Sequence, residues 1–133
     1  SGLILLKYRI VSFRDTWGTI QTTTGGYLAA FLLAHMTAAL VIARWKFGIE
    51  TDWAWAAGEP PGLFADPWSV RLIPYYSLAP MAALAHVACG LRIVLVGNGA
   101  ALHTSERIAH LIMATGILLG ILTILALLGL RVA

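Results

Sequence analysis

The chain has 133 residues, of which 59% are apolar and only 11% are charged, and its formal net charge is +3. Soluble domains carry about 25% charged residues, so this composition indicates a membrane protein of a size that allows one compact unit. The positive charge forms no block of like charges, which argues against nucleic acid as a partner. The single cysteine, Cys89, excludes a disulfide framework, a cysteine-based zinc signature and a CxxCH haem attachment.

The opening residues 1–14 contain the apolar stretch GLILLKYRIVSF, which is interrupted by Lys7 and Arg9. A spanning helix needs about 20 mostly apolar residues, so we expect this segment to lie in the membrane interface. Asp15-Thr16 and Gly18 are expected to form a break before the first span.

Three segments are long and apolar enough to cross a bilayer, at about residues 19–44, 70–96 and 108–130. We therefore predict an all-α membrane protein with three transmembrane helices. Because the links between the spans are short compared with a domain, residues 1–133 are expected to form a single transmembrane domain.

The two links between the spans differ in composition. The first holds four of the five tryptophans together with four acidic residues, and we expect it to fold along one membrane surface. In the second, Asn98-Gly99 signals a turn. Thr104 or Ser105, followed by Glu106, is expected to mark the start of the third helix.

Lysine and arginine near the span ends predict the orientation. Five lie on the N-terminal side and four on the other, which favours a cytoplasmic N-terminus: Lys7, Arg9, Arg14, Arg92 and Arg107 against Arg44, Lys46, Arg71 and Arg131. In the third span, Gly116 and Gly120 form a small-xxx-small pattern that permits close helix contact, although glycine is also common in membrane helices.

Two of the four histidines, His35 and His86, lie about nine to sixteen residues from the ends of their spans. At 1.5 Å per residue this is roughly 13–24 Å, close to mid-membrane. An ionisable side chain at that depth is costly and usually marks a site. The alternative is a neutral histidine that is hydrogen-bonded across helices. His103 and His110 are expected near the polar headgroups.

Residues three, four and seven positions away share a helix face with each histidine. The face around His86 is small and the face around His35 is apolar: Ala79, Ala82, Ala83, Cys89 and Gly90 for the first, and Leu28, Phe31, Leu32, Ala38 and Ala39 for the second. A flat macrocycle held by axial imidazoles needs such a lining, and haem in membrane cytochromes takes two such ligands. Small residues also suit ordinary helix packing. We predict His35 and His86 as axial ligands of haem iron.

The run DTWGTIQTTTGGYLAAFLLAHM resembles the first haem-binding helix of the cytochrome b subunit of succinate dehydrogenases and fumarate reductases, in particular the single-subunit dihaem type. YYSLAPMAALAHVACGLRIVL and ERIAHLIMATGILLGILTILALLGL resemble the helices that follow in that family. The resemblance covers about residues 15–130, and its anchors are Gln21, Thr24-Gly25, His35 and His86.

The resemblance implies that His35 and His86 ligate haem b. It also implies a set of residues at or near the haem propionates, namely Gln21, Thr22, Trp17 and Arg92, since a propionate needs a cation or polar donor at the membrane boundary. Interface anchoring and snorkelling are the alternative roles for Trp17 and Arg92.

The dihaem subunit has five spans in two pseudo-repeated halves, whereas this chain has three spans and the histidines of one half. The resemblance therefore implies half of a haem-binding four-helix bundle, with His35 and His86 at different haem levels. The missing ligands would come from a second copy or a related membrane subunit, which gives one or two haem b groups per assembled unit.

The function implied is electron transfer in a bacterial-type inner membrane or an equivalent energy-transducing membrane. The chain would be a subunit of an oxidoreductase complex, with no catalytic residue of its own, between peripheral iron–sulfur or flavin-type subunits and quinone. His103, Ser105, Arg107 or the tryptophan-rich link are candidates for quinone contact. The alternatives are a cofactor-free membrane anchor or assembly subunit and, with least support, a transporter fragment.

Overall fold

The computed structural model describes residues 15–58 and 67–128, which contain helices and no strand. In chain order the elements are α2 (Thr16–Met36), the π-helix η1 (Thr37–Lys46), α3 (Trp53–Ala57), α4 (Pro67–Val70), α5 (Leu72–Gly97) and α6 (Leu102–Leu127). Three helices are long and apolar enough to cross a membrane, which confirms the three-span prediction: Thr16–Lys46, Leu72–Gly97 and Leu102–Leu127. The predicted interfacial segment 1–14 lies outside the described residues.

The first span begins earlier than predicted because Asp15 caps its N-terminus. The Oδ1 atom of Asp15 accepts a hydrogen bond from the Trp17 main-chain N–H at 3.3 Å, which satisfies one of the free donors of the first turn. Gly18, which was expected in the break, lies inside α2. From Thr37 the helix continues as η1. Stretches of π-helix are rare and often occur at functional sites, and this one starts two residues after His35.

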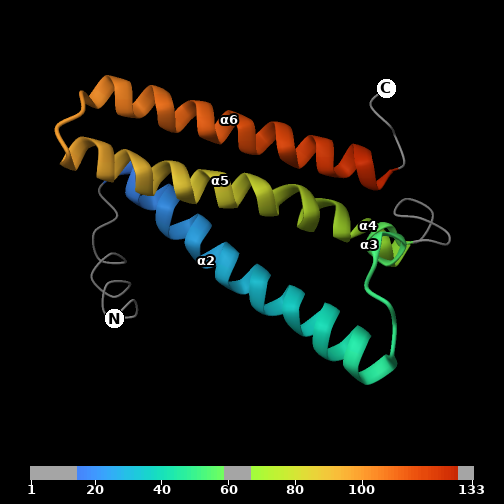
Figure 1. Cartoon of the computed structure of the whole chain (residues 1–133). Coiled ribbons are helices and arrows are strands. Elements are labelled where there is room, and N and C mark those ends of the chain that lie inside the picture. Colours follow the sequence, from blue (N-terminus) through green and yellow to red (C-terminus); the bar gives the residue numbers. More distant parts are fainter. Residues whose placement is uncertain (1–14, 59–66, 129–133) are drawn as a thin grey trace.

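α5 and α6 form an antiparallel hairpin (Figure 1). Gly99 in the connecting turn has a φ of +86°, which only glycine adopts without strain, so the predicted Asn98-Gly99 turn is confirmed. The predicted start of the third helix is wrong, because α6 begins at Leu102 and Thr104 and Ser105 lie within its first turn. The turn between α5 and α6 takes only four residues, so α6 begins directly after it.

The small-xxx-small pattern of α6 packs against α5. An added Cβ on Gly120 would lie 2.5 Å from the Ser77 main-chain oxygen and 2.8 Å from Met81 Cε. On Gly116 it would lie 3.0 Å from Leu84 Cβ. Both glycines are buried, so this pattern brings two helices of the same chain into close contact.

α2 packs on the C-terminal half of α5 and diverges from it toward the other end (Figure 1). There, α3 lies against the hairpin, and Ala57 and Leu127 form a small buried cluster with Leu72 beside it. Trp45 and Trp53, in the link expected to follow one membrane surface, are 84% and 59% exposed. Such exposure suits aromatic side chains at a membrane boundary.

Candidate functional site

His86 lies where α5 crosses α2, and its ring faces the turn of α2 that runs from Gln21 to Gly25. The Nδ1 atom of His86 is 3.0 Å from the main-chain oxygen of Gln21 and 3.4 Å from Thr24 Oγ1. A carbonyl oxygen can only accept, so Nδ1 carries the proton and donates it. In a neutral imidazole the other nitrogen, Nε2, then keeps a bare lone pair. This assignment rests on the hydrogen-bond partners.

Gly25 allows the imidazole to approach α2 this closely. An added Cβ on Gly25 would lie 2.9 Å from His86 Cε1 and 3.2 Å from Nδ1, while Nε2 lies farther away at 3.9 Å. The neighbouring Gly26 has open space, since nothing lies within 4 Å of its added Cβ. Of these two adjacent glycines, only Gly25 is therefore needed for the position of the ring.

His35 lies at a different depth. It follows Gly25 by ten residues on the same helix, which is about 15 Å along the axis. Its ring is parallel to that of Phe31, with centroids 5.5 Å apart, and lies 6.2 Å from the ring of Tyr75. Metal–imidazole bonds in proteins are about 2 Å long, so His35 and His86 of one chain do not reach the same iron.

His35 also lines a cavity of about 250 Å³ between the first span, α3 and the start of α5. The other polar or aromatic residues on its wall are Thr51, Asp52, Trp55 and Tyr76. His35 has no hydrogen bond within residues 15–58 and 67–128, in contrast to His86. The contacts that the structure describes for its imidazole are those with the rings of Phe31 and Tyr75.

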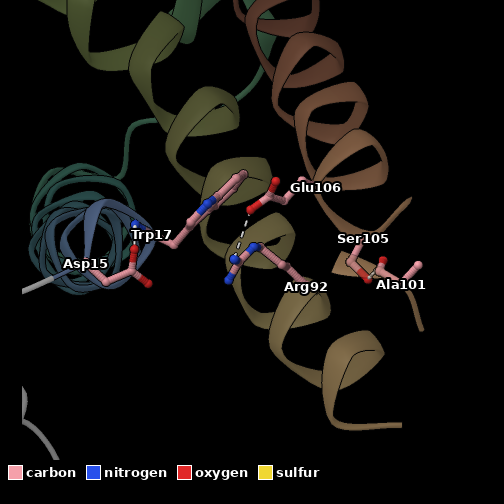
Figure 2. A network of polar contacts seen from close by, with 6 residues as sticks. All are labelled: Asp15, Trp17, Arg92, Ala101, Ser105 and Glu106. Carbon is pink, nitrogen blue, oxygen red and sulfur yellow. Dashed lines mark hydrogen bonds and ion pairs between the residues drawn. The ribbon is translucent and has the colours of Figure 1, made fainter. Parts of the chain in front are cut away.

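At the N-terminal end of α2, four side chains tie the three spans together, and Figure 2 shows three of them, Trp17, Arg92 and Glu106. Arg92 Nη2 donates to Glu106 Oε1 at 3.0 Å, and the two side chains are 16% and 34% exposed. The guanidinium of Arg92 lies 4.9 Å from the centroid of the Trp17 ring, and that ring lies 5.1 Å from the ring of His110. Arg92 Nε is buried and has no hydrogen-bond partner within the described part of the chain.

The contacts of α2 with His86 add to the roles expected along this helix. Gln21 lies at the helix crossing and contributes its main-chain oxygen to His86. Thr22 makes no side-chain hydrogen bond within the residues that the structure describes. Thr24, which had no predicted role beyond its place in the resemblance, contacts His86. It follows Gln21 by three residues and therefore shares its face, a spacing from which the contact could have been found.

The start of α6 holds a further residue that sequence reasoning missed, Glu106, which is the partner of Arg92. Opposite charges at adjoining ends of two consecutive spans are the signal that could have identified it. Ser105, a candidate for quinone contact, is fully buried and donates its hydroxyl to the Ala101 oxygen at 3.1 Å. The other candidates on this helix, His103 and Arg107, are exposed.

The residues at the crossing of α2 and α5 fit a haem group. His86 Nε2 offers the bare lone pair that iron requires. Arg92 follows His86 by six residues, about 9 Å along the helix, and its buried Nε–H is an unfilled donor of the kind a propionate binds. The crossing thus offers a lone pair of the kind that binds iron and a donor of the kind that binds a carboxylate, on the same helix.

No family model, no curated protein and no solved structure matches the chain. The resemblance to the cytochrome b subunits therefore rests on the residues quoted above.

Proposed function

We propose that the chain is a haem b-binding membrane subunit that carries electrons between a peripheral redox partner and membrane quinone, as in complexes of the succinate dehydrogenase and fumarate reductase type. The observation that carries this proposal is the hydrogen bond from His86 Nδ1 to the Gln21 oxygen. Metal-ligating histidines almost always donate their second ring N–H to a carbonyl, a carboxylate or water. His86 has this arrangement, at a depth where an ionisable residue needs a purpose.

Bound haem would supply one-electron chemistry, while the protein sets its position and electrostatic environment. His86 Nε2 would hold the iron. Arg92 would direct its free Nε–H toward a propionate, and Trp17 would cover the guanidinium from the side of α2. Gln21 contributes through its main chain.

The second axial ligand at the level of His86 would come from another chain. His35 lies about 15 Å away along α2, and the ring of His110 packs on Trp17. A second copy or a related membrane subunit would complete a four-helix bundle with one or two haem b groups. Peripheral iron–sulfur or flavin-type subunits would then exchange electrons with it. We place this assembly in a bacterial-type inner membrane with the N-terminus of the chain in the cytoplasm.

One observation favours a second function, that of a membrane anchor or assembly subunit without a cofactor. Arg92 already has an anionic partner in Glu106, and Trp17 stacks on its guanidinium. These contacts join the three spans without any bound group. In this alternative His86 would be a structural histidine that links α5 to α2.

Absorption spectroscopy of the full chain, purified in mild detergent with its membrane partners, separates the two functions. We expect a reduced-minus-oxidised haem b spectrum, confirmed by a pyridine haemochrome assay, that is lost in His86→Ala. The exposed His103 provides a matched control, and His103→Ala is expected to keep the spectrum. An assembled complex that contains no haem in the wild type would refute electron transfer and support the anchor function.

A further inference from the structure

We propose that the turn of α2 from Gln21 to Gly25 is a cradle that fixes the His86 imidazole in its Nδ1–H tautomer and thereby leaves the lone pair on Nε2. Thr24 and Gly25 are the positioning residues of this cradle. Its effect on iron rests on the proposed function, whereas the tautomer itself is a property of the haem-free chain.

The first argument concerns which groups around His86 Nδ1 donate a proton and which accept one. Thr24 Oγ1 lies 2.7 Å from the Ile20 main-chain oxygen and 3.2 Å from the Gln21 oxygen, so its single proton is donated to the main chain. Toward His86, 3.4 Å away, the hydroxyl can then only accept. Both polar neighbours of Nδ1 are acceptors, and both require a proton on that nitrogen.

The second argument is that the main acceptor belongs to a helix backbone. The Gln21 oxygen is part of α2 and is present whatever side chain stands at that position. A side-chain acceptor could rotate away, but this one can be lost only if the ring moves. The ring can lie this close to α2 because residue 25 is glycine. A Cβ at Gly25 would come within 2.9 Å of the ring and displace it.

The consequence concerns the metal bond. Donation from one ring nitrogen raises the basicity of the other and fixes the orientation of the ring. A more basic axial imidazole favours the oxidised iron, and second-shell hydrogen bonding is one of the means by which a protein sets a haem potential. Weakening the cradle is therefore expected to raise the midpoint potential of a haem held by His86.

The test begins with the full haem-free chain, labelled with ¹⁵N-histidine and reconstituted in lipid nanodiscs. Long-range proton–nitrogen correlations distinguish the two tautomers, and the signals of His86 are assigned by their absence in His86→Gln. We expect the Nδ1–H form in the wild type and in Gly26→Ala, the matched control with open space around the new methyl group. In Gly25→Ala we expect a mixture of tautomers and at least a tenfold loss in haemin affinity.

Thr24 provides a second test that does not depend on the folding of Gly25→Ala. Thr24→Val keeps the shape of the side chain and removes the hydroxyl, whereas Thr24→Ser restores the hydroxyl. In the haem-loaded chain we expect a higher midpoint potential for Thr24→Val and a return toward the wild-type value for Thr24→Ser. A purely structural role of Thr24 would leave the potential of both variants unchanged and would overturn its positioning role.

The outcomes distinguish the cradle from the proposed function. An Nε2–H tautomer in the wild type, or the same tautomer distribution in Gly25→Ala as in Gly26→Ala, would overturn the cradle even if haem binds. An Nδ1–H tautomer in the chain, together with an assembled complex that contains no haem, would support the cradle and refute the electron-transfer function.

Discussion

Substitution of Gly120 by alanine tests the contact on which the α5–α6 hairpin depends. The added methyl group would meet the Ser77 main-chain oxygen at 2.5 Å and Met81 Cε at 2.8 Å. Met81 can rotate away, but the oxygen belongs to the α5 backbone and cannot, so the two helices must separate. Overpacking of this kind costs about 1–3 kcal/mol.

Part of that cost is offset by the higher helix propensity of alanine, about 0.8–1 kcal/mol relative to glycine. We therefore expect Gly120→Ala to lower the free energy of unfolding by up to about 2 kcal/mol, which is up to a roughly 30-fold change in the equilibrium constant. Gly116→Ala is expected to have a smaller effect, because its nearest neighbour is Leu84 Cβ at 3.0 Å.

The measurement is an SDS titration of the purified full chain in mixed micelles, followed by energy transfer between probes on α5 and α6. Gly26→Ala is the matched control, since its added Cβ meets nothing within 4 Å. We expect this control to unfold at the wild-type SDS fraction or above it. If Gly120→Ala is as stable as Gly26→Ala, the close approach of α5 and α6 at Gly120 is not what holds the hairpin together.

Two further predictions use the same preparation. Glu106→Gln is expected to destabilise the chain by about 1 kcal/mol in the SDS titration, because the Arg92 guanidinium exchanges a charged acceptor for a neutral one. The exposed Glu50 is the control, and equal stability of Glu50→Gln and Glu106→Gln would contradict a role for the ion pair. Cys89 is only 1% exposed, so a maleimide should label it at least tenfold more slowly in the folded chain than in excess SDS. The control is Leu102→Cys in a Cys89→Ala background, which places a thiol at a position that is 53% exposed. This thiol should react with the maleimide without unfolding. If Cys89 in the folded chain reacts as fast as this control, Cys89 is not buried.

The amino-acid sequence by itself determined the three helices and the positions of the two histidines within them. The thickness of the hydrocarbon layer dictates how long an apolar segment must be, and the rise of a helix then converts a position in that segment into a depth. Because backbone groups cannot be left unpaired in lipid, such segments are helices whatever their partners. His35 and His86 could therefore be singled out before any contact was known.

Only the tertiary structure decided which faces of these helices meet. The spans are apolar nearly all round, and lipid is as apolar as their side chains, so hydrophobic patterning does not select a partner face. Packing shape and a few polar contacts select it instead. Gly120 meets α5, Thr24 rather than Thr22 contacts His86, and Arg92 pairs with Glu106. The sequence contains each of these residues, but the contacts exist only where the helices cross, and the proton on Nδ1 of His86 follows from such a crossing.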